Sequence, residues 1–442
     1  MTTRYAVIGT GHRCQMYLDA IGGEHSDVAT LVALVDINPG RVEIHKARMV
    51  AKYGYDPDTI ATGGPDDVER ILAETKADKA IITTPDYTHA EMIVRCLNAG
   101  VDVIVEKPLT IDAESAKRIE QAVKETGRNV IVTFNYRYSP RNSELRRIIR
   151  DGEIGDVVSV TFEWVLDTVH GADYFRRWHR AKKWSGGLLI HKSSHHFDLV
   201  NYWLADAPAR VYASGGVKFY GSANADKRGL PAREPRGTHD GEHGPFELDL
   251  RNDARLKELY LDQEHHDGYI RDQDVFGEGV TTEDNLSVIV DYRGGATLTY
   301  ALNAHAPWEG YRVAVNGTKG RAELEVVERV AVLNDNGQAI VDPSFVADNS
   351  EGGARVRGDK LILQKHWDVA REVPIPEGIG GHGGGDAFLL RDVFVGVSDD
   401  PLGRASDWVD GMRAISVGIC GNVSLEEGRP VTPAELGLPL DR

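Results

Sequence analysis

The sequence predicts an N-terminal doubly wound α/β domain with a parallel sheet, followed by an α+β domain with an open, mostly antiparallel sheet. Three observations predict this fold class. Continuous apolar runs alternate with helical segments over the first third of the chain, as in parallel strands covered on both faces. From about residue 134 the strands alternate apolar and polar side chains, as in a sheet with one covered face. Finally, 442 residues are too many for one compact core, so we place the domains at 1–135 and 136–442.

Short apolar runs and helical segments define the elements of the first domain. Asp112 stands directly before a helical segment and is expected to cap it. A strand followed by a helix, repeated, indicates crossover connections between parallel strands. Strands are expected at 5–8, 31–35, 79–82, 101–105 and 129–132, with helices at about 12–21, 40–52, 66–75, 88–98 and 112–126.

The second domain is expected to be a sheet with helices and one long insertion. A polar, charged segment at about 221–282 interrupts the sheet. Such a segment inside a compact domain is more often a lid or binding loop than a linker, and its run 264–274 is dense in functional side-chain types. Strands are expected at 158–164, 210–213, 286–290, 296–300, 312–315 and 322–326, with helices at 143–150, 194–204, 386–397 and 407–425.

Composition excludes several classes of partner. The net charge of −17 disfavours nucleic acid and anionic membrane surfaces. The chain has no run of about 18 apolar residues, so no membrane span is expected. Three cysteines, Cys14, Cys96 and Cys420, lie far apart and match neither a disulfide framework nor a zinc ribbon. We therefore expect a cytoplasmic protein with a small-molecule partner.

A glycine loop follows the first strand and predicts a dinucleotide site. Gly9 allows the tight turn, and Gly11 lets the backbone approach a pyrophosphate at the helix N-terminus. Cys14 occupies the place of the third glycine of this fingerprint. Asp36 ends the second strand, where a carboxylate accepts hydrogen bonds from ribose hydroxyls and repels a 2′-phosphate. The pattern indicates a Rossmann domain that prefers NAD to NADP. The alternative is an ordinary strand–turn–helix without a ligand.

Further polar residues stand where strands end, which is where open α/β sheets bind ligands. Glu106-Lys107-Pro108 follows the strand at 101–105, and Thr84-Pro85 follows the strand at 79–82, with His89 just beyond. By composition alone, a lysine such as Lys107 is more often a solvated surface residue. Its place at a strand end, before a proline, favours a functional role.

Together these residues resemble the Gfo/Idh/MocA oxidoreductase family, named for glucose–fructose oxidoreductase and inositol dehydrogenase. The resemblance spans the first domain and the start of the second, but not the insertion. It rests on Gly9-Thr10-Gly11, Asp36, Thr84-Pro85 with His89, Glu106-Lys107-Pro108-Leu109, Phe134-Asn135-Tyr136-Arg137-Tyr138, Gly186-Gly187-Leu188-Leu189, and His195 with Asp198. The loop and the resemblance together assign cofactor contacts to Gly9, Thr10, Gly11, His12, Arg13, Asp36, Thr84, Pro85, His89, Glu106 and Asn135.

The resemblance also implies the catalytic residues. Lys107 would position the reacting hydroxyl, and His195 would act as the general base. In the family motif an aspartate stands four residues before this histidine, and here that position holds His191. The change favours a second acid/base group or an anionic substrate. The alternative is that the histidines at 191, 195 and 196 only cap the helix at 194–204.

The sequence does not require a metal. His191 and His195 have the i, i+4 spacing of a zinc pair, and His265 and His266 lie among acids in the insertion. Nothing else in the sequence requires a metal, because the glycine loop already indicates a cofactor.

A basic, aromatic segment at 174–184 precedes the histidines. It carries five Arg or Lys in eight residues, which suits a pyrophosphate or an anionic substrate, while its tryptophans suit a sugar ring. A solvated loop or a subunit contact is an equal alternative. Substrate contacts are expected from Arg137, Tyr174, Arg177, Trp178, His196 and His382.

The leading hypothesis is an NAD-dependent dehydrogenase that acts on a secondary hydroxyl of a sugar, sugar derivative or cyclitol. A second hypothesis follows from the resemblance, because some relatives keep NAD bound and hydrolyse glycosides by transient oxidation, elimination and hydration. A non-enzymatic nucleotide sensor is the third, and the presence of both Lys107 and His195 argues against it. The resemblance also implies a homodimer or homotetramer formed through the open sheet.

Overall fold

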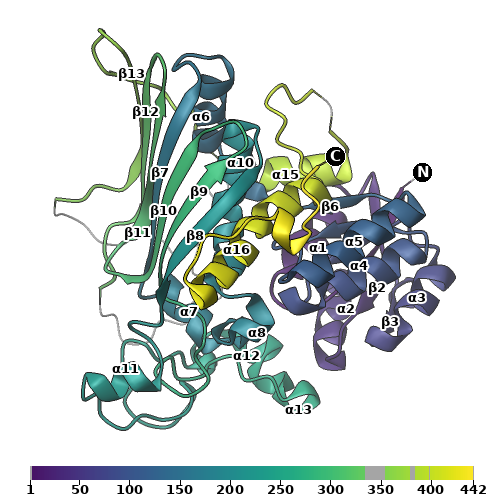
Figure 1. Cartoon of the computed structure of the whole chain (residues 1–442). Helices are drawn as coiled ribbons and strands as arrows, with labels where there is room; N and C mark the ends of the chain where they lie inside the picture. Colours follow the sequence, from purple (N-terminus) through teal and green to yellow (C-terminus); the bar gives the residue numbers. More distant parts are fainter. Residues whose placement is uncertain (1, 334–353, 379–383, 398, 442) are drawn as a thin grey trace.

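The computed structural model describes residues 2–333, 354–378, 384–397 and 399–441 (Figure 1). Two sheets lie side by side, with helices packed between them (Figure 1). No helix in these ranges is long and apolar enough to cross a membrane.

The first sheet is parallel, with strand order β3-β2-β1-β4-β5-β6. The order reverses between β1 and β4, which places a ligand crevice at the carboxyl ends of these strands. The predicted doubly wound fold is therefore confirmed. The strands are β1 (Thr3–Ile8), β2 (Ala29–Val35), β3 (Ala61–Gly63), β4 (Lys79–Ile82), β5 (Asp102–Val105) and β6 (Val130–Val132), and the helices are α1 (Cys14–Gly22), α2 (Pro39–Tyr53), α3 (Val68–Thr75), α4 (His89–Asn98) and α5 (Ala113–Thr126).

Local chemistry explains where these elements begin and end. Val7 and Ile81 in the central strands are fully buried, as helices on both faces of a sheet require. Asp112 caps α5, since its Oδ1 accepts from the Ser115 amide at 2.8 Å. Gly54 ends α2 in the left-handed conformation, where glycine is favoured.

The second sheet has the order β14-β13-β12-β11-β7-β10-β9-β8. Its neighbours are antiparallel except for β7 and β10, which run parallel, so the predicted mostly antiparallel sheet is confirmed. The strands are β7 (Val157–Asp167), β8 (Pro208–Gly216), β9 (Asn285–Tyr292), β10 (Thr297–Ala306), β11 (Glu309–Gly317), β12 (Gly320–Arg329), β13 (Gly358–Lys365) and β14 (Arg371–Glu372).

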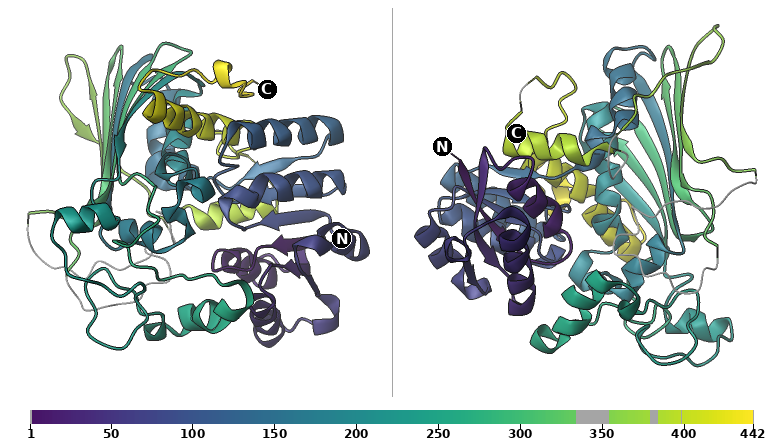
Figure 2. Two further views of the ribbon diagram at one scale, coloured as in Figure 1. Left: turned by 60° about the horizontal axis from the view of Figure 1, so that its bottom comes forward. Right: turned by 180° about the vertical axis from the view of Figure 1, so that it is seen from behind.

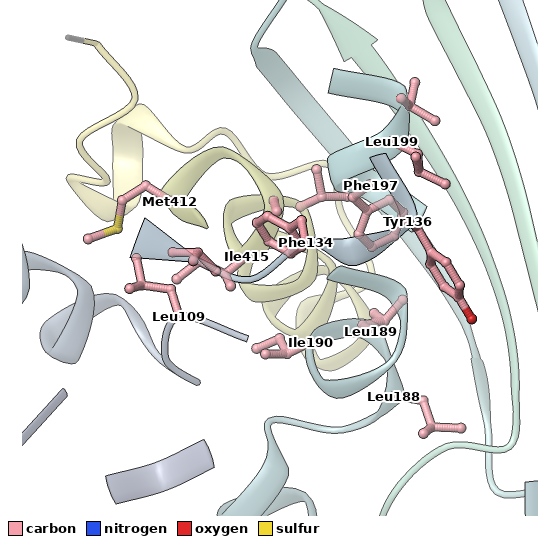
Figure 3. Packing of buried hydrophobic residues seen from close by; sticks show 14 of the residues in the cluster. Leu109, Phe134, Tyr136, Leu188, Leu189, Ile190, Phe197, Leu199, Met412 and Ile415 are labelled. Atoms are coloured by element: carbon pink, nitrogen blue, oxygen red, sulfur yellow. The ribbon is translucent and has the colours of Figure 1, made fainter. Parts of the chain in front are cut away.

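Helices cover one face of this sheet and join the two domains (Figure 1). The joining core contains Phe134 from the linker, Leu189 and Phe197 from α9 and α10, and Ile415 from α16 (Figure 3). A Cβ added to Gly418 would lie 2.6 Å from the carbonyl oxygen of Leu189, so glycine permits the close approach of α16 to α9. The helices are α6 (Pro140–Arg150), α7 (His170–Arg176), α8 (Lys182–Ser185), α9 (Leu188–His191), α10 (Ser193–Leu204), α15 (Asp386–Phe394) and α16 (Trp408–Glu427).

The insertion joins β8 to β9 and holds three short helices, α11 (Ser222–Lys227), α12 (Ala254–Leu259) and α13 (Glu264–Asp267). It leaves the end of the second sheet and reaches the first domain, where α12 and α13 lie beside the N-terminal helices (Figure 2). The sequence places this segment outside both sheets, and the structure brings it back onto the first domain.

Candidate active site

A cleft of about 530 Å³ lies between the two domains. It begins at the glycine loop, follows the carboxyl ends of the strands of the first sheet, and ends among side chains from α7, α9 and α10. The insertion closes one side. Of the predicted site residues, the cleft is lined by Gly9, Gly11, His12, Arg13, Asp36, Thr84, Pro85, His89, Glu106, Lys107, Asn135, Tyr174, Arg177, Trp178, His191 and His195.

The glycine loop packs tightly on one side and is open on the other. Gly9 has φ +94°, and a Cβ on it would lie 2.7 Å from the carbonyl carbon of Thr83, so only glycine fits. A Cβ on Gly11 would meet only the Tyr260 hydroxyl, at 3.6 Å. The backbone at Gly11 is therefore accessible from the cleft, as a pyrophosphate would require. Thr10 has a buried side chain, and its amide donates to Asp36 Oδ2 at 2.5 Å.

Asp36 anchors the far end of the cleft. Its Oδ1 accepts from the Asn38 amide at 2.8 Å and from Arg41 at 3.0 Å. A carboxylate offers about four acceptor positions, so these bonds leave capacity for ribose hydroxyls.

Glu106 holds the base of the cleft together. Its Oε1 accepts from Arg13 Nε and from the Tyr17 hydroxyl, both at 2.7 Å. Although burial acts to raise it, the charges of Arg13 and Lys107 lower the pKa of Glu106 below its usual value. Glu106 is thus an anion that fixes Arg13, while the next residue, Lys107, faces the second domain.

Lys107 lies at the junction of the two domains. Its Nζ donates to the carbonyl oxygen of His191 at 3.3 Å. Burial lowers the pKa of Lys107, and the carboxylates of Asp86 and Glu106 act in the opposite direction. The ammonium group is held in a dry position beside the histidines of α9 and α10.

His191 makes a hydrogen bond that the sequence did not reveal. Its Nδ1 lies 2.5 Å from Oδ2 of Asp86, a residue of the first domain directly after Pro85. Burial raises the pKa of Asp86, while the nearby charges of Lys107 and Arg177 act in the opposite direction and favour its carboxylate form. Burial lowers the pKa of His191 well below its usual value, and the charge of Lys107 lowers it further. The ring is therefore neutral, with Nδ1 toward Asp86 and Nε2 available to the cleft. The sequence feature that could have indicated this role of Asp86 is its position shortly after the end of a parallel strand, β4.

His195 lines the cleft one turn further on. Its ring packs against Tyr136 at 4.7 Å and Phe134 at 6.0 Å between centroids. Lys192, on the chain between the two histidines, also lines the cleft, with its Nζ 5.0 Å from the centroid of a Trp164 ring. The sequence did not single out Lys192.

Tyr174 and Trp178 form an aromatic wall around His191. The Tyr174 hydroxyl lies 3.0 Å from Nε2 of His170. The Trp178 ring stacks on His179 at 3.6 Å, and both rings contact His191. Such a wall suits the apolar face of a sugar or cyclitol ring.

Among the described residues, Arg177 is the one arginine or lysine of the basic segment that lines the cleft. It donates to Asp173 at 3.0 Å. Arg176 donates to the carbonyl oxygen of Phe246, Arg180 to that of Glu278, and Lys182 to Glu283. These three partners lie in or next to the insertion. The segment therefore anchors the insertion, a role that the sequence analysis did not consider.

Two expected substrate contacts lie outside the cleft. Arg137 forms a buried ion pair with Asp198, with nitrogen–oxygen distances of 2.8 and 2.6 Å. His196 is buried, stacks on Trp164 at 4.1 Å and bonds the Tyr300 hydroxyl at 2.7 Å. The His196 side chain points into the second domain because α10 turns it away from the side of His195. His382 lies outside the described residues.

His89 and Asn135 line the cleft in different ways. The ring nitrogens of His89 lie 2.7 Å from the carbonyl oxygen of Pro108 and 2.9 Å from that of Thr84, so this side chain joins two loops. Asn135 donates to Asp386 at 2.7 Å, and its Oδ1 has no hydrogen-bond partner in the part of the chain that the structure describes.

These features fit a nicotinamide dinucleotide. The open backbone at Gly11 suits a pyrophosphate, Asp36 suits a ribose, and the orphaned Oδ1 of Asn135 can accept from an amide. Within the described ranges, no three His, Cys, Asp or Glu side chains are grouped so that they could hold a metal.

Known proteins show the same organisation. Residues 3–134 match the family model "Oxidoreductase family, NAD-binding Rossmann fold", and residues 146–432 match "Oxidoreductase family, C-terminal alpha/beta domain". The chain is 33% identical to the Bacillus subtilis (strain 168) protein YteT, which is named as an oxidoreductase, over 95% of each chain. It is 31% identical to an inositol 2-dehydrogenase of Rhizobium meliloti (strain 1021), over 49% of this chain and 59% of that protein.

Solved structures share the fold. An aldose–aldose oxidoreductase from Caulobacter crescentus superposes with a TM-score of 0.62 and 16% identity, over 98% of this chain and 100% of that one. Both family models, and the relative from Bacillus subtilis that matches over 95% of each chain, indicate the same oxidoreductase family. The chain therefore belongs to the Gfo/Idh/MocA family of oxidoreductases, and it is an NAD(P)-dependent dehydrogenase that acts on CH–OH groups.

Proposed function

We propose that the enzyme moves a hydride between a secondary hydroxyl of a sugar, sugar derivative or cyclitol and NAD. The observation that supports this most strongly is the meeting of Lys107, His195 and the Asp86–His191 pair in one cleft that begins at the glycine loop. A relative named as an inositol 2-dehydrogenase supports a ring-shaped polyol as the substrate class.

Several residues of this chain would hold the cofactor. The backbone at Gly11 would face the pyrophosphate, Asp36 the ribose hydroxyls, and Asn135 the carboxamide. When bound, the nicotinamide ring supplies the acceptor for the hydride.

The Asp86–His191 pair supplies the general base. The Nε2 of neutral His191 accepts the hydroxyl proton while the carbon loses its hydrogen as hydride, so the alcohol becomes a ketone. The Asp86 carboxylate favours the imidazolium that forms, as an acid bonded to Nδ1 does. Sequence analysis placed the base at His195. The Asp86 contact leads us to assign the proton to His191 and substrate positioning to His195.

Lys107 would stabilise the oxygen as it loses its proton. Its ammonium group is buried beside His191, and a positive charge in a dry site interacts strongly with developing negative charge. A Lys107→Met variant keeps the length of the side chain and removes the charge. We expect its kcat to fall about 10²-fold or more while NAD still binds. Full activity in this variant would contradict the assignment.

The test begins with the purified protein. Bound nucleotide is released and identified, and the holoenzyme is then incubated with sugars, cyclitols and aryl glycosides while NADH absorbance and products are followed together. NADH that rises in step with a keto product supports the dehydrogenase.

A redox-neutral glycoside hydrolase is the second candidate, and the insertion favours it. The Tyr260 hydroxyl accepts from the His12 amide at 3.0 Å, so the insertion lies across the glycine loop and would retain a bound nucleotide. In this reaction the sugar is oxidised, the aglycone leaves by elimination, water adds, and the hydride returns to the sugar. Cleavage of an aryl glycoside without net NADH, lost when NAD is stripped, would establish it.

We also propose that copies of the chain assemble through the open face of the second sheet. Tyr212 and Ile289 pair across β8 and β9 on this face and are 40% and 47% exposed. Exposed apolar side chains at neighbouring positions of a sheet are typical of an interface.

A further inference from the structure

Two residues at the adenosine end of the cleft give opposite indications about the cofactor. Asp36 at the end of β2 is the acid expected for NAD. Arg41, in the first turn of α2, is of the type that accommodates the 2′-phosphate of NADP. Both side chains line the cleft. The residues of the first domain alone therefore do not determine whether the enzyme prefers NAD or NADP.

The insertion supplies a third charge at this point. Oδ2 of Asp267 lies 2.6 Å from a terminal nitrogen of Arg41, and the same nitrogen lies 3.0 Å from Oδ1 of Asp36. The three side chains are 9% exposed or less. Although burial acts in the opposite direction, the amide of Tyr269 and the charge of Arg41 lower the pKa of Asp267. Arg41 is thus held between two carboxylates, and the cluster carries one net negative charge.

Other contacts hold Asp267 in place. The Nδ2 of Asn38 donates to the carbonyl oxygen of Gln263 at 3.0 Å, and Tyr260 accepts from His12. Arg255 donates to the side chain of Gln15. The insertion therefore docks on the first domain from the glycine loop to the start of α2, and α13 ends at Asp267 beside Arg41.

We propose that Asp267, from the insertion of the second domain, sets the preference for NAD by holding Arg41 away from a 2′-phosphate. This rests on the proposed function only in its choice of NAD as cofactor. A doubly charged phosphate would meet a cluster that is already negative. Without the Asp267 charge, Arg41 keeps only its contact with Asp36 within this cluster, and its remaining N–H donors can bind the 2′-phosphate.

The experiment measures nucleotide binding without substrate. Dissociation constants for NAD and NADP are determined by calorimetry on nucleotide-free wild type, Asp267→Asn and the control Asp262→Asn. Asp262 lies in the same segment, pairs with exposed Lys257 at 2.7 Å and is outside the cleft. We expect Asp267→Asn to shift the NADP/NAD affinity ratio about tenfold toward NADP, from the removal of one nearby charge, and Asp262→Asn to leave it unchanged.

A second variant identifies the group that binds the phosphate. Arg41→Ala added to Asp267→Asn should abolish the gained affinity for NADP. An unchanged ratio in Asp267→Asn, or a gain that survives the loss of Arg41, would overturn the proposal, as would a wild type that prefers NADP. If Asp267→Asn does not fold, Asp267→Ser gives the same comparison. Turnover on sugars tests the proposed function separately, because failure of catalysis leaves the binding ratios unaffected.

Discussion

At the scale of single residues, the catalytic arrangement depends on a contact between domains. Asp86 follows a strand of the first sheet, and His191 ends α9 in the second domain. Their 2.5 Å contact sets the ring so that Nδ1 faces Asp86. An acid bonded to Nδ1 fixes the ring orientation that leaves Nε2 to take the proton, and it stabilises the charge that the ring acquires during the reaction.

Replacing Asp86 with Asn tests this arrangement. The amide keeps the shape but carries no charge, so it cannot stabilise a protonated His191. We expect kcat to fall by about 10²-fold or more, with NAD affinity within about twofold of wild type. Steady-state kinetics and calorimetry measure the two quantities. An Asp86→Asn enzyme with wild-type kcat would show that His191 is not the base.

The pH profile follows from the pKa of the same histidine. Burial and the charge of Lys107 lower this pKa well below the usual 6.5. A base with a lowered pKa stays unprotonated to more acidic pH, so activity is lost only when the pH falls below that lowered value. We expect the acid limb of kcat/KM for alcohol oxidation to lie below pH 6.5, measured at constant ionic strength. An acid limb at or above pH 6.5 would argue against His191.

The sequence predicts residues at strand ends better than residues on helices. Lys107 and Asp36 line the cleft because parallel strands bring their carboxyl ends to one edge. His195 and His196 are neighbours in sequence, yet one faces the cleft and the other stacks on Trp164. That difference depends on how α10 is rotated against the sheet, which local spacing does not reveal.

At the scale of elements, the basic segment 174–184 holds the insertion in place through hydrogen bonds. Arg176 is 7% exposed, and its Nε and a terminal nitrogen both donate to the carbonyl oxygen of Phe246. Composition predicts the positive charge of this segment. It does not predict the partners, because they lie 70 to 101 residues away in sequence.

Arg176→Ala should loosen the insertion. The change leaves the carbonyl oxygen of Phe246 without its donors, at a cost of about 1–3 kcal/mol. We expect faster cleavage within residues 221–282 by a protease under native conditions. Lys183→Ala is the control, since Lys183 is exposed beside Trp184 and makes no contact with the insertion among those found for the described residues. Equal cleavage rates in both variants would contradict the anchoring role.

The sequence did not predict the strand β13, the short helices α7 to α9 and α11 to α13, or the short edge strands β3 and β14. β3 has three half-buried residues and β14 has two exposed ones, so neither shows an apolar period. Both exist because a neighbouring strand offers unpaired backbone groups at the sheet edge. By contrast, β9 and β10 alternate buried and more exposed residues along their length and were predicted, although the predicted segment 296–300 covers only the first part of β10.

At the scale of the whole molecule, one core joins the two domains while one sheet face stays open. Helices α9, α10 and α16 cover the inner face and pack against the linker at Phe134 (Figure 3). On the outer face, Tyr212, Ile289, Thr299 and Thr161 lie in one row across four strands, and all are exposed.

Ile289→Lys tests whether this face forms an interface between copies. A lysine in the middle of an apolar contact would have to lose water without gaining a partner, so association should weaken. We expect wild type to elute as a dimer or tetramer and Ile289→Lys to shift toward monomer, with mass measured by light scattering. Phe388→Lys is the matched control, because Phe388 is 45% exposed on α15, outside the sheet. If Ile289→Lys keeps the wild-type mass, or if Phe388→Lys dissociates instead, the open face is not the contact. Any oligomer would then have to form through another surface.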